Sequence, residues 1–460
     1  MENFWDSSVW GVINIVAILL LSLLVANVIK KRVKFLQASL IPTSVLGGAI
    51  LLAIAGLYDL LTGDALFETR FFGEDGYKAL EIITYHALAL GFIASTFKSS
   101  KTKLTKQRTV EIFNTGVTTV STYLIQAIFG MLTTIIACKF MKDFFVAAGI
   151  LLPFGFGQGT GQALNYGNIF ETDFGFVEGK SFGLTIAAMG FLSASIGGVV
   201  HLNILKKKNK IKIATYKEGK LNSEDVQSAD EIPMQDSMDK MTVQIAFVLV
   251  AYLLAYLLMF LLGNILSGMK SVIYGFNFLL GVLSATLIKA VLNLMKKKSI
   301  VKKGYINDFL MTRTSNFFFD LMVVAGIAAI RLGMLQRYWG IVLILSVVGI
   351  IITYSYNYFV AKKLFPDYCE EQFLMMYGML TGTASTGTIL LREIDGEFKT
   401  PAADNMVYQN FPAIVFGFPI MLIVTLAPVK PILTTIIVTV FFLVMNIILF
   451  REFIFKKRKK

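Results

Sequence analysis

Two short runs of small and hydroxylated residues interrupt the apolar sequence and are the segments best suited to binding an ion or a small polar molecule. The first reads Gly155-Phe-Gly-Gln-Gly-Thr-Gly161, and the second reads Thr381-Gly-Thr-Ala-Ser-Thr-Gly-Thr388. Glycine weakens a helix interior, and hydrocarbon offers no water to freed backbone groups. Irregular backbone at membrane depth therefore survives only inside protein or beside a watery cavity. One such break in each half of a chain points to the binding site of a transporter.

In the first run, alternating glycines let backbone groups approach a ligand closely, and nearby side chains add polar atoms. Freed carbonyl oxygens suit sodium, whereas amides at the start of a half-helix attract a carboxylate. The candidate substrate-binding residues here are Gly157, Gln158, Gly159, Thr160, Gly161 and Asn165, and Gly155 is a candidate sodium ligand. The alternative interpretation is that the small residues serve tight helix packing.

The second run offers hydroxyl groups, which can coordinate a cation or donate to an anionic substrate. The candidate substrate-binding residues are Thr383, Ser385, Thr386, Thr388 and Arg392, and Thr381 is a candidate sodium ligand. Arg392 could bind a substrate carboxylate in a bidentate manner, although an arginine is also expected near the cytoplasm. Threonines in membrane helices often bond their own preceding carbonyls, so each hydroxyl also has a purely local interpretation.

Three further polar residues are candidate sodium ligands. Asp320 lies near the middle of a predicted span, where an ionisable residue is costly, and the repeat described below matches it roughly to the region of His86. It could bind sodium, relay a proton, or pair with another buried polar group. Asp404 and Asn405 open a later span; they could be cation ligands, but an N-cap is the favoured interpretation.

Composition indicates the class of protein that holds these segments. Of the 460 residues, 55% are hydrophobic and 16% are charged, and the mean hydropathy is +0.68. A soluble fold cannot hide this much apolar surface, so we expect a polytopic protein embedded in a lipid bilayer. The formal charge of +13 is spread over short clusters between apolar runs, which is typical of topology signals and argues against nucleic-acid binding. Cys138 and Cys369 fall on opposite predicted faces, so neither a disulfide nor a zinc site is expected.

A hydrocarbon core needs roughly 20 helical residues, and the apolar runs supply two matching series of five spans. The predicted spans are 9–29, 41–61, 79–97, 109–137 and 181–205, then 241–262, 271–295, 308–330, 338–361 and 406–426. Each interrupted run falls between the fourth and fifth span of its series. The expected organisation is a first repeat (1–205) with a re-entrant loop at about 144–178, a cytoplasmic linker (206–240), a second repeat (241–426) with a re-entrant loop at about 370–404, and an extra C-terminal transmembrane helix (431–455).

Basic clusters decide the predicted orientation. Lys and Arg gather in the loops after the first, third, fifth and seventh spans and at the C-terminus, which places those segments in the cytoplasm and the N-terminus outside. The first apolar run lacks a small-residue cleavage site and is expected to be a retained span. Because five is odd, the two repeats are inverted, and their re-entrant loops should enter from opposite faces and meet near the midplane. The alternative is that one or both runs are surface loops.

Three stretches of the sequence carry a resemblance to a known family: Ala147-Ala-Gly-Ile-Leu-Leu-Pro-Phe-Gly-Phe-Gly-Gln-Gly-Thr-Gly-Gln162, Phe182-Gly-Leu-Thr with Gly197-Gly198, and Ile41-Pro-Thr-Ser-Val-Leu-Gly-Gly48. In these stretches the sequence resembles the bacterial glutamate:sodium symporter family, and the similarity extends by element order over residues 10–426. The family usually has His where this chain has Gln158, and its second loop is richer in Gly and Pro. The resemblance implies sodium coupling, a dicarboxylic amino acid as substrate, a location in the bacterial inner membrane, and a homodimer in which a mobile core moves past a static scaffold.

The expected function is therefore a sodium-coupled secondary symporter for glutamate or a related small carboxylate, working by alternating access, with no cofactor other than the coupling sodium. We expect no enzymatic activity. A nucleotide-binding Gly-x-x-x-x-Gly-Lys-Ser/Thr motif is missing from the sequence, and an intramembrane aspartyl protease would need two facing aspartates where only Asp320 lies deep in a span. A proton- or sodium-coupled carrier of hydroxycarboxylates or other organic acids, and a channel, are the remaining alternatives.

Overall fold

The computed structural model describes residues 3–98, 105–208, 226, 231–234, 237–301, 303–396 and 399–455. Within these ranges the regular secondary structure is helical, apart from an isolated bridge between Glu231 and Gly304, and turns and loops join the helices. Most of the predicted linker at 206–240 and the basic residues 456–460 lie outside the described residues.

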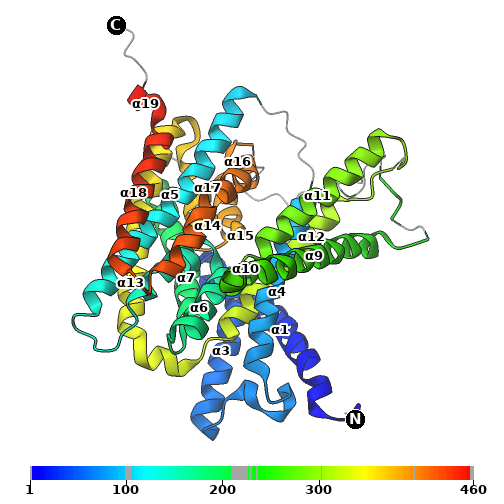
Figure 1. Ribbon diagram of the computed structural model, residues 1–460, viewed down its shortest axis with the longest axis vertical. Helices are drawn as coiled ribbons and strands as arrows, with labels where there is room; N and C mark the ends of the chain where they lie inside the picture. The colour runs from blue at the N-terminus through cyan, green and yellow to red at the C-terminus, as the bar shows by residue number, and fades with distance from the viewer. Residues whose placement is uncertain are drawn as a thin grey trace.

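The helices follow one another along the chain in the order given below (Figure 1). The first half contains α1 (Ser7–Arg32), α2 (Lys34–Ala38), α3 (Thr43–Thr62), η1 (Leu66–Glu68), η2 (Arg70–Phe72), α4 (Gly76–Phe97), α5 (Lys106–Ala137), η3 (Val146–Ile150), η4 (Pro153–Gly157), α6 (Gly159–Phe174) and α7 (Gly179–Lys207). The second half contains α9 (Lys240–Ile265), η5 (Ser267–Met269), α10 (Lys270–Gly275), α11 (Asn277–Lys297), α12 (Asp308–Ala328), α13 (Leu332–Leu364), η6 (Pro366–Tyr368), α14 (Cys369–Thr381), α15 (Ala384–Arg392), α16 (Ala402–Tyr408), α17 (Asn410–Ile423), η7 (Val424–Leu426), α18 (Pro431–Leu449) and α19 (Arg451–Phe455).

Several of the long helices begin at a polar N-cap, as expected where a chain enters an apolar run. Thr105 accepts a hydrogen bond from the amide of Arg108 at the start of α5, and Asp239 accepts from the amides of Met241 and Thr242 at the start of α9. These caps satisfy amide groups that lack a partner within the helix. The polar cap thus fixes the residue at which each apolar helix starts.

Nine helices among the described residues are long and apolar enough to cross a membrane, or ten if the bent pair of α16 and α17 counts as one span. Eight of the nine coincide with predicted spans, namely the first seven and the span predicted at 338–361. The ninth coincides with the extra C-terminal run predicted at 431–455. The prediction of an all-α polytopic membrane protein is confirmed at this level. The most apolar helices, α1 and α9, are only 22% buried inside the protein, which leaves most of their surface for lipid.

The two remaining predicted spans differ from a simple apolar helix. The predicted span 308–330 forms α12, but Arg313, Asn316 and Asp320 lower its apolar character, and α12 is not among the nine. The predicted span 406–426 is bent by 49° between α16 and α17. Pro412 lies in the first turn of α17, where its missing N–H cannot continue the hydrogen-bond ladder from α16.

The helices pack as two bodies, each built from both halves of the sequence. In the first body α1, α3 and α4 pack with α9, α11 and α12, and α4 against α12 is its most extensive contact. In the second body α5 and α7 pack with α13, α14, α15 and α17, and α18 covers α5. In Figure 1 the second body lies on the left, α9, α11 and α12 of the first body lie on the right, and α1, α3 and α4 of the first body lie toward the bottom.

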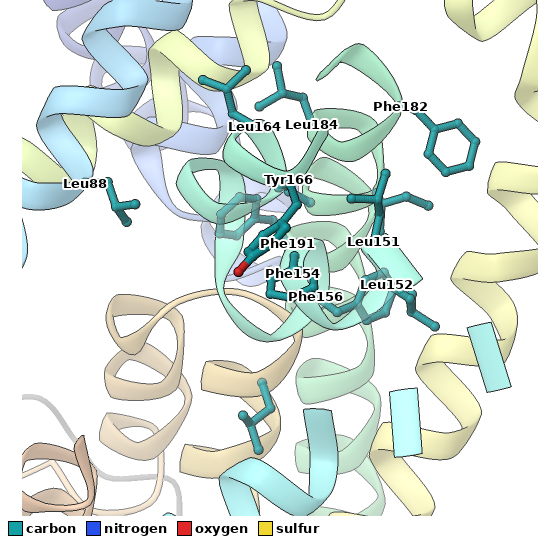
Figure 2. Close-up of a cluster of buried hydrophobic side chains, with 14 of the residues drawn as sticks. Leu88, Leu151, Leu152, Phe154, Phe156, Leu164, Tyr166, Phe182, Leu184 and Phe191 are labelled. Atoms are coloured by element: carbon teal, nitrogen blue, oxygen red, sulfur yellow. The ribbon is translucent and has the colours of Figure 1, made fainter. Parts of the chain in front are cut away.

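Helix α6 lies between the two bodies. It packs on α7 and η4 of the second body and also contacts α4, α10 and α12 of the first. The apolar core around it is dense: Phe154, Phe156, Phe182 and Phe191 are almost wholly buried (Figure 2). The Phe154 ring lies against the Tyr166 ring at 4.0 Å between centroids. The first glycine run is thus embedded in protein.

Candidate functional site

The first run is irregular backbone enclosed on almost every side. Pro153 opens a short π-helix, η4, which ends at Gly157, and α6 starts at Gly159 after the half-buried Gln158. Gly159 has φ +77°, a left-handed conformation that glycine adopts without the cost a side chain would impose. We call residues 153–161 the first break.

The second run breaks the chain between two short helices. Helix α14 ends at Thr381, Gly382 and Thr383 are non-helical, and α15 starts at Ala384 and packs back on α14. Thr381 and Thr386 are fully buried, whereas Thr383, Ser385 and Thr388 are half-buried. We call residues 381–388 the second break.

The two breaks meet, although more than 200 residues separate them in the sequence. A Cβ atom placed on Gly159 would lie 3.5 Å from Thr383 Cγ2 and 3.7 Å from the carbonyl oxygen of Gly382. The ring of Phe191 in α7 lies beside both glycines. Helices α6 and α15 both begin at this contact, so the amide-rich, electropositive ends of two helices converge on one point.

A small pocket adjoins this meeting point. It is lined by residues from the start of α3, from α7, from α12 and from the second break: Pro42, Ser44, Val45, Phe191, Phe319, Asp320, Val323, Thr383 and Ser385. The centre of a water molecule could occupy a volume of about 10 Å³ in this pocket. The pocket therefore has room for about one water molecule or one small ion. Ser44 and Asp320 lie in the lining of this same pocket. A carboxylate and three hydroxyl groups are hard oxygen donors of the kind that alkali and alkaline-earth cations prefer.

Asp320 belongs to a polar stripe on α12 that is open to the surface. Arg313, Asn316 and Asp320 follow one another at three- and four-residue spacing, which puts them on one helix face, and all three are exposed. A charged side chain is costly against lipid. This face is therefore better suited to a water-filled passage than to the bilayer.

Not every candidate of the first break reaches the pocket. Gly155 packs on α7, where a Cβ atom would lie 2.7 Å from Ile186 Cγ2 and 2.8 Å from the amide nitrogen of Ala187. Gly157 lies against Tyr123, whose hydroxyl donates to the Gly157 carbonyl at 3.2 Å. These two glycines allow the helices to pack closely, which was the alternative interpretation of the small residues in the sequence.

Three other candidates face the first body. The Thr160 hydroxyl lies 3.4 Å from the Met322 carbonyl oxygen in α12, Gly161 packs on Leu88 of α4, and the Asn165 amide donates to the Gly275 carbonyl at 3.2 Å. They form the surface on which the second body touches the first.

An ion cluster ties the bodies together beside Asn165. Lys180 Nζ in α7 lies 2.9 Å from Glu81 Oε2 in α4 and 3.3 Å from Glu171 Oε1 in α6. Arg331 adds a contact of 3.5 Å to Glu81. The Lys180 and Glu81 side chains are only 18% and 14% exposed, so this contact is screened less than a surface pair.

The hydroxyl groups of the second break divide into two kinds. Thr381 and Thr388 donate to the carbonyls of Tyr377 and Ala384 one turn earlier, which is the local role. Thr383 and Thr386 lie 3.5 Å apart through their hydroxyl oxygens, and Thr383 lines the pocket with Ser385. Arg392 ends α15, roughly 10 Å along the helix from Ser385.

Asp404 and Asn405 lie in a separate hydrogen-bond network around Arg108. The Arg108 guanidinium pairs with Glu111, donates to Asn405 Oδ1 at 3.0 Å and lies 3.9 Å from Asp404 Oδ2. The Asn405 amide donates to Tyr368 and Gln372, both at 3.0 Å. Burial raises the pKa of Tyr368 above its usual range, so its phenol stays protonated and donates to Glu111. Neither Asp404 nor Asn405 caps α16, which starts after Pro401.

Several residues near the breaks were not among the sequence candidates. Ser44 and Pro42 lie in the Ile-Pro-Thr-Ser motif, which carries the resemblance but did not indicate a site. Gln126 reaches the second break from α5: its amide donates to Thr353 Oγ1 at 2.9 Å and to the Leu380 carbonyl at 3.0 Å, while its own oxygen has no partner among the described residues. A buried polar group without a partner costs about 1–3 kcal/mol. A glutamine within an apolar span was the signal available in the sequence.

Comparison with known proteins adds no assignment: no protein-family model and no curated protein matches this chain. The fold and the apolar helices define its class, a multi-pass, all-α membrane protein.

Proposed function

We propose that the protein is a sodium-coupled secondary symporter for glutamate or a related small carboxylate. The observation that carries the proposal is the contact between Gly159 and Thr383, where two breaks from different halves of the chain meet beside a carboxylate-lined pocket. Unwound segments at such a meeting point are the usual binding sites of secondary transporters.

The proposed membrane topology follows from the helix ends. Basic residues close α1 (Lys30, Lys31, Arg32), α7 (Lys206, Lys207) and α11 (Lys296, Lys297), and we assign these ends to the cytoplasm. The first break would then enter from outside and the second from the cytoplasm. The two series of five spans would be inverted repeats, which the packing of α4 on α12, the third helix of each series, supports.

Each ligand has suitable chemistry at the meeting point. The Asp320 carboxylate with the hydroxyl groups of Ser44, Thr383 and Ser385 would hold sodium. The converging starts of α6 and α15 would favour the substrate carboxylate, since helix N-termini carry partial positive charge and unpaired amide groups. Bound sodium would add a further positive charge for the anionic substrate, which gives a physical basis for coupling.

The contacts between the two bodies support alternating access. On the side assigned to the outside, α6 and the Lys180–Glu81 pair join the bodies. On the cytoplasmic side, the exposed stripe of Arg313, Asn316 and Asp320 leads to the pocket. This arrangement fits an inward-facing state, in which the second body would be the moving core and the first the scaffold. The proposed assembly is a homodimer, which the mass of the detergent-solubilised particle would test.

A proton-coupled carrier of organic acids is the second candidate. It is favoured by one feature: among the described residues, Asp320 is the only titratable side chain that lines the pocket, and a carboxylate can carry a proton. A channel would need a continuous open path and a much higher flux than a conformational carrier allows.

Uptake into proteoliposomes tests the proposal. Labelled glutamate should accumulate when an inward sodium gradient is imposed and should stop accumulating when choline replaces sodium. Accumulation driven by an inward proton gradient without sodium would favour the second candidate. Indifference to both gradients would refute coupled transport of this substrate.

A further inference from the structure

A cavity lies at one end of the second body, away from the two breaks. The start of α5 and the ends of α13 and α18 surround it, and α19 adds to its wall. Its volume of about 560 Å³ falls within the range of about 300–1,000 Å³ that small-molecule sites occupy. We call this cavity the end pocket. Its lining residues are Lys106, Gln107, Val110, Glu111, Asn114, Lys363, Leu364, Leu449, Glu452 and Phe453.

The end pocket contains two ammonium groups that no carboxylate neutralises. Lys106 and Lys363 are both exposed, and neither forms an ion pair with another of the described residues. Glu111, by contrast, is already held by the Arg108 guanidinium and by the hydroxyl of Tyr368. The two lysines, which come from different helices, are therefore left for an anion.

The remaining carboxylate of the lining does not cancel this charge. Glu452 follows Arg451, whose guanidinium donates to Asn114 Oδ1 at 2.9 Å and lies over the Phe113 ring, 5.1 Å from its centroid. Together with Arg108, four cationic side chains lie in or beside the end pocket with two carboxylates. The pocket is thus positively charged, and its ligand should be an anion.

The end pocket lies at the level that lipid headgroups occupy. Helices α5, α13 and α18 are all long and apolar enough to cross a membrane, so their ends belong at the membrane surface. One helical turn before Lys363, the exposed Phe359 of α13 packs on Phe450 of α18 at 5.7 Å between ring centroids. Ile447 of α18 is also exposed. A charged pocket is therefore continuous with apolar surface. In Figure 1, α18 and α19 are the red helices on the left.

We propose that the end pocket binds an anionic phospholipid, whose phosphate accepts hydrogen bonds from Lys106 and Lys363 while its acyl chains lie along α13 and α18. Charge-assisted hydrogen bonds to phosphate are among the stronger ones, and basic pockets between membrane helices suit the headgroups of anionic lipids. The bound lipid would join the ends of α5, α13 and α18. The extra C-terminal helix then has a role, because it supplies one wall of the lipid site. This inference goes beyond the proposed function and does not depend on the transported molecule.

The first test removes the two charges. The variant Lys106→Gln/Lys363→Gln loses both ammonium groups at exposed positions, so it should fold normally while its affinity for phosphatidylglycerol falls by about tenfold or more. Native mass spectrometry of the purified full-length protein in detergent, titrated with this lipid, measures the affinity of the tightest site.

The matched control removes two lysines that do not line the end pocket. Lys207 and Lys362 are exposed and close the basic ends of α7 and α13, so Lys207→Gln/Lys362→Gln changes the net charge by the same amount. Its affinity for phosphatidylglycerol should stay within about twofold of the wild type. An equal loss of affinity in the two variants would overturn the proposal, because general surface charge would then explain lipid binding.

A second variant fills the pocket without changing its charge. Val110 is half-buried in the lining, and Val110→Trp keeps both lysines while occupying part of the cavity. This variant should also bind phosphatidylglycerol about tenfold more weakly. Wild-type affinity in both Val110→Trp and Lys106→Gln/Lys363→Gln would place the lipid elsewhere and overturn the site.

Two further ligands identify the source of the phosphate. The wild type should bind phosphatidylcholine, whose headgroup carries no net charge, about tenfold more weakly than phosphatidylglycerol. Inorganic phosphate should not displace phosphatidylglycerol at equal concentration, because it lacks the acyl chains. Equal affinity for the two lipids would overturn the charge argument, and displacement by inorganic phosphate would show a site for a free anion instead of a lipid.

Discussion

The two breaks in the chain have similar compositions but different surroundings. Most of the first break is fully buried, and Gly155 and Gly157 are fitted closely against α7 and α5. The second break keeps Thr383, Ser385 and Thr388 half-buried, and two of these line the pocket with Asp320. Under the proposed function, the first break would hold the backbone in place and offer the start of α6, while the second would offer side chains to a ligand. Glycine content alone does not distinguish these two roles.

The largest expected effect separates the two breaks by stability. Gly155→Ala would bring a methyl group within 2.8 Å of the backbone of α7, and overpacking of this kind costs about 1–3 kcal/mol. Ser385→Ala removes a half-buried hydroxyl and should change stability by less than about 0.5 kcal/mol. Thermal unfolding in detergent measures both variants. Equal losses would mean that the first break is no more tightly packed than the second.

The next effect concerns the ion. Asp320→Asn removes the carboxylate that lines the pocket and should weaken sodium activation of ligand binding by about tenfold, equivalent to about 1.4 kcal/mol. Asp404→Asn is the matched control, because Asp404 lies by Arg108 and not in the pocket. A sodium titration followed by ligand-induced stabilisation measures both. An unchanged titration for Asp320→Asn would leave Asp320 with a structural role.

A smaller effect is expected at the contact between the bodies. Glu81→Gln weakens the link from Lys180 to α4 while Glu171 still holds Lys180, so the bodies should separate more readily on that side. The reporter is a cysteine introduced as Ser385→Cys in a variant that lacks Cys138 and Cys369. Because the inward-facing state would then be less populated, this cysteine should react several-fold more slowly with a thiol reagent applied from the cytoplasmic side once Glu81→Gln is added. The Lys78→Gln variant, whose exposed pair with Asp75 lies on the same helix, is the control. An unaltered reaction rate would mean that the ion cluster does not affect the equilibrium between the inward-facing and outward-facing states.

The smallest effect distinguishes hydroxyl groups within the second break. Thr388 bonds the Ala384 carbonyl of its own helix, so Thr388→Ala should change ligand affinity by less than about twofold. Thr383→Ala removes a hydroxyl that lines the pocket and should have the greater effect. Binding measured by thermal stabilisation compares the two. A larger loss for Thr388→Ala would place the ligand further along α15 than the pocket.

The sequence predicted the helices better than the directions of the side chains. Apolar length located α5, predicted at 109–137 and found at Lys106–Ala137, and clustered glycines located both interruptions. Hydropathy reports burial in lipid or protein but not which neighbour a side chain meets. Thr160 and Asn165 therefore could not be assigned to the contact between the bodies, nor Asn405 to the Arg108 network, because their partners lie more than 100 residues away.

The central claim is that the two breaks reach their meeting point from opposite faces of the membrane. The test places single cysteines in a variant that lacks the native cysteines. One replaces Lys139, which precedes the segment of the first break, and the other replaces Asp367, which precedes α14; both positions are exposed. A membrane-impermeant maleimide applied to intact cells and to inverted vesicles reports the side of each. The account predicts that Lys139→Cys reacts only from outside and Asp367→Cys only from the cytoplasm. Reaction of both from the same side would contradict it.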